Sequence, residues 1–336
     1  MSKCQLRPCL HGPVFSDDSL EPLQSTTGPK PPAGVLPALA TKVQGTILGV
    51  PSYRWRHGCG PTAVGMVVGY WDMQAYTGLI SGDSSTQTDA VNQAIASEGV
   101  TTNEHYEDYA LPIDHSPNML TDACITAGRT PHADNCIADW METSRSTDNN
   151  YYGWSWSNDI CPAFNSYINS RGSDFGPTSH EFTWSGFSWE NLKTEIDEGR
   201  PLVFLVDSNG DGYTDHFVTI VGYSDDKGYQ EYGCRDTWSD VVRWERFRMI
   251  SASYTWGVSR IYTFVVDHED VWWVDFYYSA YENGTFSRPY NTLAEAVSAA
   301  NPGDTIYVKN GNSNETITIE KRLNIYAFQG SFSISN

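Results

Sequence analysis

Cys59 stands between two glycines in the stretch WRHGCGPTAVGMVVGYWD, which runs from Trp55 to Asp72. Pro61 follows, and proline suits the first turn of a helix because the backbone N–H that it lacks would have no partner there. The next residues are apolar on nearly every face, which predicts a buried helix that begins at the cysteine. A thiol at this position feels the positive end of the helix dipole, which favours the nucleophilic thiolate.

Four uses are open for this cysteine: a small core residue, one half of a disulfide, a metal ligand or a nucleophile. The chain has seven cysteines and no CxxC pair, which argues against a zinc ribbon or a thioredoxin-like motif. A nucleophilic cysteine needs a base within reach, and the base needs an orienting group. His216 opens the apolar run HFVTIVGY and Asp236 follows in YGCRDTW, so the chain supplies both downstream. This set favours the nucleophile.

The stretches VPSYRWRHGCGPTAVGMVVGYWD and DHFVTIVGYSDDKGYQEYGCRDTW together resemble the bacteriocin-processing (double-glycine leader) peptidase family and its secreted relatives, which have a papain-like fold. The resemblance implies a cysteine-type peptidase that hydrolyses a polypeptide substrate through a Cys-His-Asp triad and a thioester acyl-enzyme. It places the nucleophile at Cys59, the base at His216 and the orienting acid at Asp236. It implies no required cofactor.

The oxyanion-binding group departs from that pattern. Papain-like enzymes usually carry a Gln six residues before the nucleophile, and Tyr53 stands there in this chain. One lost oxyanion donor costs about a hundredfold or more in rate. The alternative function is therefore a catalytically inactive papain-like domain in an adhesion or carbohydrate-binding surface protein. The candidates for a second donor or for the cleft wall are Tyr53, Arg54, Trp55 and His57.

The turn DSNGDGYTD, just before His216, has the spacing of a calcium loop, with Gly212 at the sharp bend. Position 12 holds Val218 instead of the usual bidentate Glu. Two interpretations stay open: a structural calcium site that fixes the loop before His216, and an acidic turn rich in Asn, Asp and Gly. The candidate ligands are Asp207, Asn209, Asp211, the Tyr213 carbonyl and Asp215.

Charge and hydropathy limit the partners. The chain has 41 acidic and 21 basic residues, a net charge of −20, which disfavours nucleic acid and anionic membranes as partners. No stretch reaches the roughly 18 apolar residues of a membrane span. The N-terminal sequence MSKCQLRPCLHGPVFSDDS lacks the apolar core of a secretory signal, although the acidic composition leads us to expect a secreted or cell-surface protein.

We expect three parts along the chain. Residues 1–42, rich in Pro and Gly, read as a leader or linker. Residues 43–270 are dense in aromatic and apolar residues and form the peptidase domain. Its fold class is α+β, with a buried N-terminal helix that carries the cysteine and an antiparallel sheet that carries His216 and Asp236. Short apolar runs at 201–207 and 216–226 predict buried strands, and 188–199 predicts a helix with Ser188 as its N-cap.

Residues 271–336 differ from the rest. A short helix over 293–300 leads into strand-like pieces such as TIYV, ETITIE and LNIYAF, spaced about ten residues apart. The stretch from Pro289 to Val308 resembles the capping helix and first coil of a pectate-lyase-like, right-handed parallel β-helix. The resemblance implies an incomplete β-helix that binds a polysaccharide or another cell-surface ligand. The alternative to a β-helix is a small β-structured appendage on the first domain.

Overall fold

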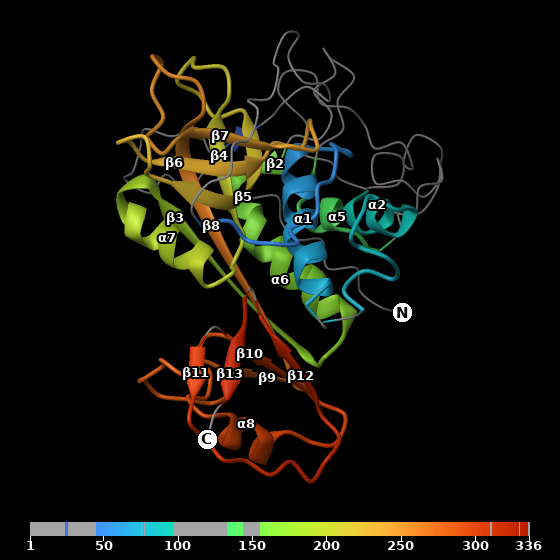
Figure 1. Ribbon diagram of the computed structural model, residues 1–336. Coiled ribbons are helices and arrows are strands. Elements are labelled where there is room, and N and C mark those ends of the chain that lie inside the picture. Colours follow the sequence, from blue (N-terminus) through green and yellow to red (C-terminus); the bar gives the residue numbers. More distant parts are fainter. Residues whose placement is uncertain are drawn as a thin grey trace.

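The computed structural model describes residues 24–25, 45–74, 76, 78–96, 133–143, 155–309, 311–328 and 330–334. A larger body holds a twisted sheet flanked by helices, and a smaller body made of the C-terminal residues lies at one end of it (Figure 1). No helix of the described residues is long and apolar enough to cross a membrane.

A six-stranded antiparallel sheet forms the centre of the larger body, with the strand order β3-β8-β4-β5-β6-β7. Every residue of β4 and β5 is buried, as the two apolar runs predict, because both lie inside the sheet and are covered on both faces. The strands are β3 (Phe175–Thr183), β4 (Leu202–Asp207), β5 (His216–Ser224), β6 (Glu231–Arg235), β7 (Val242–Arg246) and β8 (Gly257–His268).

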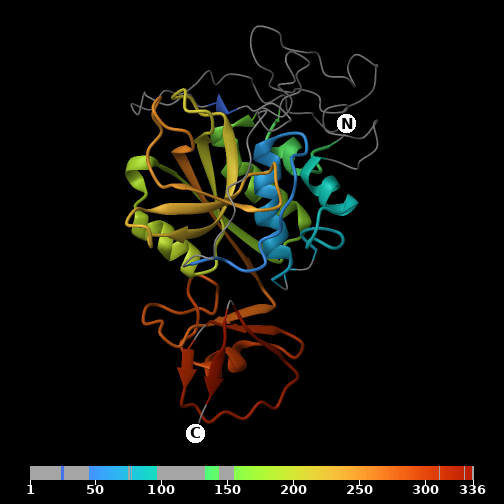
Figure 2. The same cartoon turned by 45° about the horizontal axis from the view of Figure 1, so that its top comes forward.

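Helix α1 (Cys59–Asp72) packs along β5 with all of its 14 residues buried, so the predicted helix that begins at the cysteine is confirmed. A side-chain bond fixes the helix against this strand: the Thr219 hydroxyl of β5 donates to the Ala63 carbonyl at 2.9 Å. Further helices gather beside α1 on the same side of the sheet (Figures 1 and 2). They are α2 (Asp89–Ala96), α5 (Ile137–Trp140) and α6 (Ile160–Arg171).

Helix α7 (Trp189–Asp197) lies on the other side of the sheet (Figure 1). Its predicted N-cap is confirmed, since the Ser188 hydroxyl oxygen accepts a bond from the Asn191 amide at 3.2 Å. The minor elements of the larger body are β1 (Gln24–Ser25), which pairs with β2 (Ser155–Trp156), and two 3₁₀ turns, η1 (Ser157–Asp159) and η2 (Trp184–Gly186).

The smaller body consists of short parallel strands and one helix. Strand β10 lies between β9 and β12 and runs parallel to both, and β11 runs parallel to β13. The described residues hold these pairs and no longer stack of coils, so the β-helix stays a prediction. The elements are β9 (Val271–Val274), α8 (Leu293–Ala299), β10 (Thr305–Val308), β11 (Gly311–Ser313), β12 (Asn324–Ala327) and β13 (Phe332–Ile334).

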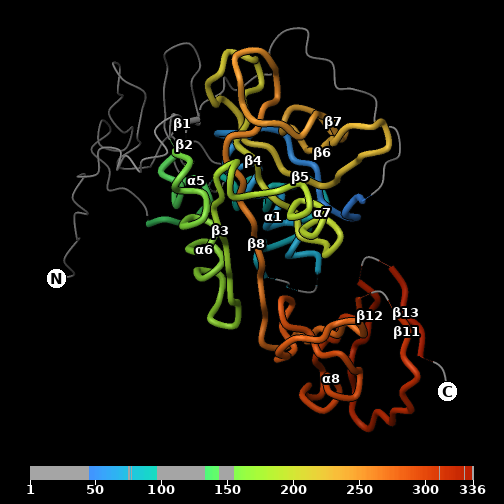
Figure 3. Tube along the Cα trace, turned by 90° about the vertical axis from the view of Figure 1, so that its left-hand side faces the viewer, coloured from blue at the N-terminus to red at the C-terminus, as the bar shows by residue number. Residues whose placement is uncertain are grey.

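The hydrophobic core of the larger body extends into the smaller body, which also holds a second, small cluster around α8 and β10. The long strand β8 runs from the sheet toward the smaller body, as the trace in Figure 3 shows. At the junction Phe286 is fully buried, with its ring centroid 5.2 Å from that of Trp71 at the end of α1 and 4.5 Å from that of Trp273 on β9. The Trp273 indole N–H also donates to the Tyr76 hydroxyl at 3.0 Å. The C-terminal part is therefore not a loosely attached tail.

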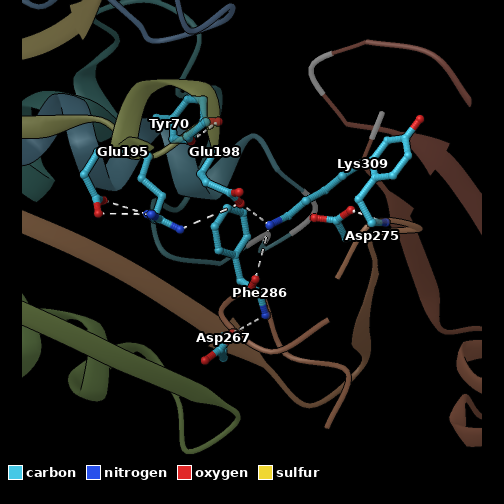
Figure 4. A network of polar contacts seen from close by, with 10 residues as sticks. Tyr70, Glu195, Glu198, Asp267, Asp275, Phe286 and Lys309 are labelled. Atoms are coloured by element: carbon cyan, nitrogen blue, oxygen red, sulfur yellow. Dashed lines mark hydrogen bonds and ion pairs between the residues drawn. The ribbon is translucent and has the colours of Figure 1, made fainter. Parts of the chain in front are cut away.

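A polar network surrounds Phe286 at this junction (Figure 4). The Lys309 ammonium is ion-paired with Glu198, just beyond α7, and lies 4.5 Å from the centre of the Phe286 ring. On the same ring, the Arg200 guanidinium lies 5.7 Å from the centroid and is held by Glu195 at 2.6 Å. The Phe286 amide donates to Asp267 at 3.0 Å. Charged groups from both bodies thus close over one buried ring.

Replacement of Phe286 by alanine tests the shared core. We expect Phe286→Ala to lower the free energy of unfolding by about 3–5 kcal/mol, since it opens a cavity beneath two tryptophans. Calorimetry of the full chain should show one unfolding transition for both bodies. Tyr277→Ala is the matched control, because Tyr277 belongs to the smaller body but is 73% exposed. Two separate transitions in the unmodified chain would contradict the shared core.

Candidate active site

Three chain segments bring the predicted catalytic residues to one end of the sheet. Cys59 is the first residue of α1, His216 is the first residue of β5, and Asp236 follows the last residue of β6. Gly58 has a φ of +134° at the turn into the helix, which explains a glycine before the cysteine. A Cβ on Gly60 would lie 2.7 Å from the Met141 methyl, so a larger residue after the cysteine would require the Met141 side chain to shift.

The Cys59 side chain is buried and lies beside the start of β5. The Phe217 backbone N–H donates to Cys59 Sγ at 3.4 Å. This amide and the N-terminal end of α1 both favour negative charge on the sulfur. The start of β5 thus contacts the thiol through the residue that follows His216.

The His216 ring is held by a backbone group of Asp236. Its Nε2–H donates to the Asp236 carbonyl oxygen at 2.8 Å. A carbonyl can only accept, so Nε2 carries the proton and Nδ1 of the neutral ring has a free lone pair. Nδ1 is buried and has no hydrogen-bond partner among the described residues. That nitrogen is the basic atom of the ring.

Burial lowers the pKa of His216 to about 4, and the positive charge of Arg243 adds to this, while the Asp236 carbonyl bond and charge oppose it. The imidazole is therefore neutral at pH 7 and able to accept a proton. The same shift affects stability. The unfolded chain binds this proton near pH 6.5, whereas the folded chain binds it only near pH 4. The free energy of unfolding therefore falls as the pH is lowered from about 6.5 to about 4.

Two tryptophans enclose the imidazole. The Trp238 ring is stacked on the His216 ring, with centroids 4.1 Å apart and planes 16° apart. Trp256 approaches the same ring edge-on at 6.0 Å. The stack fixes the plane of the imidazole and shields its bond to Asp236 from water. The sequence analysis did not single out Trp238, and its only signal is its position two residues after Asp236.

The Asp236 carboxylate does not face the imidazole, contrary to the orienting role expected for it. Oδ2 accepts a bond from Arg243 Nε at 3.1 Å, in an ion pair that is almost fully buried. Oδ1 accepts bonds from the backbone N–H groups of Trp238 and Ser239 at 3.0 and 2.9 Å. The carboxylate thus shapes the turn after β6, and the turn presents the carbonyl to His216. Sequence reasoning missed Arg243 because nothing in its local spacing marks it.

Two oxyanion candidates are corrected by the structure. Tyr53 is fully buried, and its hydroxyl donates to the Ser84 carbonyl. Its ring fills the space beside Gly69, ten residues along α1 from Cys59, or about 15 Å by the helical rise. Arg54 is exposed and ion-paired with Asp240 at 2.6 Å. Both side chains are held elsewhere, so neither is the second donor.

The other two candidates, Trp55 and His57, lie in the segment that leads into Cys59. The Trp55 backbone N–H donates to the Thr237 carbonyl at 2.7 Å, which ties the segment before Cys59 to the turn after Asp236. The Trp55 indole Nε1 is buried and has no partner among the described residues. His57 is half-buried with a φ of +50°, and its ring centroid lies 6.3 Å from that of Trp55.

The oxygens of the acidic turn before His216 bond to the turn itself. The buried Asp207 carboxylate accepts bonds from the amides of Gly210 and Gly212 at 2.6 and 2.7 Å. Burial raises the pKa of Asp215 to about 7, and the charges of Asp207 and Asp211 add to this. Among the described residues no group of three His, Cys, Asp or Glu side chains could hold a metal ion. The calcium site, with Asn209 and Tyr213 as further ligands, stays a prediction.

Comparison with known proteins assigns the chain to a family. Residues 47–257, more than half of the chain, match the model of the Peptidase_C39 like family, and the chain belongs to that family. Membership indicates a cysteine peptidase that acts on polypeptide. No curated protein matches the chain. Active wild-type interpain A, a cysteine protease of Prevotella intermedia, matches with a TM-score of 0.36 and 13% identity, over 68% of this chain and 98% of that one.

An Asp236→Asn substitution separates the roles of the carbonyl and the carboxylate. We expect it to lower the free energy of unfolding by about 3–5 kcal/mol, since it breaks the buried ion pair with Arg243 and leaves that cation with the longer contact to Glu245 at 3.4 Å. Well below the unfolding temperature, kcat should change by no more than about tenfold, because the carbonyl that holds His216 is retained. Asp240→Asn, at the exposed pair with Arg54, is the control and should change little. A loss near 10⁴-fold in kcat, the loss seen where a carboxylate orients the histidine directly, would contradict this division.

Proposed function

We propose that the chain hydrolyses peptide bonds with Cys59 as nucleophile, His216 as general base and acid, and Asp236 as the residue that orients the imidazole. The observation that carries the proposal is the state of the His216 ring. Its Nε2–H is fixed on the Asp236 carbonyl, and its Nδ1 is a buried, unprotonated nitrogen with no partner among the described residues. A buried base without a partner is costly in a core but is the group that a thiol nucleophile requires.

Each step of the reaction follows from this arrangement. His216 Nδ1 takes the thiol proton as Cys59 Sγ attacks the peptide carbonyl carbon, and the Phe217 amide stabilises the developing thiolate. The imidazolium then gives its proton to the leaving amine nitrogen, and the C–N bond breaks to leave a thioester. Water attacks the thioester while His216 takes one of its protons, and the carboxylic acid product leaves as the thiol is restored.

Asp236 acts through its backbone in this proposal. Its carboxylate is neutralised by Arg243 and bonded to two amides, so its charge stabilises the imidazolium less than a direct contact would. The lowered pKa of His216 agrees with this. The resting imidazole is then neutral, and it takes up the proton of the thiol as Cys59 attacks.

The oxyanion would be bound by the Cys59 backbone N–H and the Trp55 indole N–H. The first lies at the start of α1, where the helix dipole favours an anion. The second is a buried donor with no partner among the described residues, four residues before the nucleophile. An indole N–H can take the place of the Gln amide because the oxyanion needs only a fixed donor in a site without water.

The C-terminal body would begin a parallel β-helix. In-register parallel pairing supports this, since Thr305 on β10 pairs with Val271 on one side and Asn324 on the other. A polysaccharide or cell-surface ligand for this body, and a secreted location, remain predictions from the sequence.

Alkylation of Cys59 tests the nucleophile and decides against the inactive alternative. We expect iodoacetamide to label Cys59 at neutral pH faster than a free thiol such as glutathione, since the helix N-terminus and the Phe217 amide favour the thiolate. Cys161 is a reference within the same chain, because burial raises the pKa of its thiol to about 11. Cys59→Ala should abolish hydrolysis of casein, and Cys161→Ala should not. Slow labelling of Cys59, together with unchanged hydrolysis in Cys59→Ala, would contradict the proposal and favour the alternative of a catalytically inactive domain in an adhesion protein.

A Trp55→Phe substitution tests the indole donor. It keeps an aromatic ring and removes the N–H, so we expect kcat to fall by about a hundredfold with little change in KM. Because the iodoacetamide reaction forms no oxyanion, the rate of Cys59 alkylation should stay the same in this variant. Equal losses in alkylation and in kcat would show that Trp55 only supports the fold.

A further inference from the structure

A hollow of about 550 Å³ lies far from Cys59, between the turn that joins β5 to β6 and the chain that follows β7. His216 stands at the start of β5 and Asp236 just after the end of β6, while the hollow begins at Gly228, between the end of β5 and the start of β6. The hollow is therefore at the opposite end of this hairpin from the candidate active site. Arg246 and Arg248 are its two charged lining residues.

Each arginine lies over a tyrosine ring of the same hollow. The Arg246 guanidinium lies 4.0 Å from the centre of the Tyr229 ring, and the Arg248 guanidinium lies 4.1 Å from the centre of the Tyr254 ring. An aromatic ring accepts no N–H bond in the plane of the guanidinium, so this contact leaves N–H groups available to a ligand. Those edges are the part of arginine that binds a carboxylate through two parallel bonds.

The donors of these arginines are incompletely used. Neither guanidinium forms an ion pair with any residue that the structure describes, although the chain has 41 acidic residues. Arg248 donates from Nη2 to the Thr255 carbonyl at 3.2 Å, but its Nε is buried and has no partner within the described part of the chain. By contrast, Arg54, Arg200, Arg243 and Arg260 each have an acidic partner within 4.0 Å.

The nearby carboxylates are held by other cations. Glu231 lies opposite Arg246 in the β6–β7 register, but its side chain is ion-paired with Lys227 at 3.0 Å. Glu245 accepts a bond from Arg243 at 3.4 Å. The hollow thus holds two positive groups with no carboxylate ion-paired to them among the described residues, on a protein with a net charge of −20.

We propose that Arg246 and Arg248 form a binding site, separate from the Cys59 centre, for the carboxylate side chains of an acidic peptide segment. The adjacent strand favours a peptide. Strand β7 is the edge of the six-stranded sheet in the described residues, and it runs directly into the hollow through Arg246. An extended peptide that pairs with this edge would bring its acidic side chains to the two guanidiniums.

The site would discriminate between peptides by the positions of their carboxylate side chains relative to the two arginines. Stacked guanidiniums lose little freedom when a ligand binds, so the affinity depends on the bidentate geometry more than on net charge. Lysine at these positions would keep the charge but lose that geometry.

Fluorescence anisotropy on the full chain tests the site, with Cys59→Ala present so that the probe is not consumed. The probe is a fluorescein-labelled, C-terminally amidated peptide of alternating Thr and Glu, with a Thr-Gln peptide as its neutral counterpart. We expect the Glu peptide to bind at least about tenfold more tightly than the Gln peptide. Replacement of both arginines by Gln should weaken it by about tenfold or more, and Lys at both positions should recover only part of the loss.

Arg288→Gln is the matched control, because Arg288 also lies over a tyrosine, Tyr281, but lines no part of the hollow. Arg246 is exposed, so the Arg246→Gln single variant tests the proposal even where the double variant fails to fold. Equal affinity of the Glu peptide for the unmodified chain and the arginine variants would overturn the proposal. Displacement of the peptide by oligogalacturonate, with direct binding of that sugar lost in the variants, would overturn the peptide as ligand and assign the site to acidic polysaccharide.

Discussion

The complete burial of α1 is the constraint on which both ends of the molecule depend. A helix that is apolar on nearly every face cannot lie on a surface, so sheet, helices and loops must surround it. At its first residue the surrounding elements are the starts of β5 and of the turn after β6, which place the Phe217 amide against the sulfur and hold the imidazole at the same end of the sheet. At its other end Trp71 is covered by Phe286 from the C-terminal body. One sequence feature therefore orders the candidate active site and the junction together.

The orientation and the protonation state of His216 are set by neutral groups more than by charged ones. A backbone carbonyl fixes one ring nitrogen, an indole covers the ring face, and the neighbouring carboxylate forms an ion pair with a buried arginine. This combination keeps the imidazole uncharged at neutral pH while leaving its other nitrogen as the base. The role usually given to the third triad residue is thus divided: Asp236 orients by its main chain and shapes the turn by its side chain.

The features that could be predicted from the sequence are the local ones. The spacing of Gly58, Cys59 and Pro61 defines the start of α1, and the apolar run after His216 defines β5, because each depends on residues a few positions apart. Tyr53 was misjudged because its position is set by contact with Gly69, on a distant turn of the helix. The atoms of Asp236 that face His216 could not be foreseen either, since they depend on Arg243 from the next strand. The shared core requires Trp71 to meet Phe286, and no short-range pattern encodes that contact.

The stack of Trp238 on His216 has an optical consequence. A protonated imidazole accepts an electron from an excited indole far more readily than a neutral one does, so emission from Trp238 would be quenched when the histidine gains its proton. The chain contains 12 tryptophans, but only Trp238 among the described residues has its ring stacked on that of His216. The candidate active site therefore carries its own reporter of the protonation state of its base, with no added label.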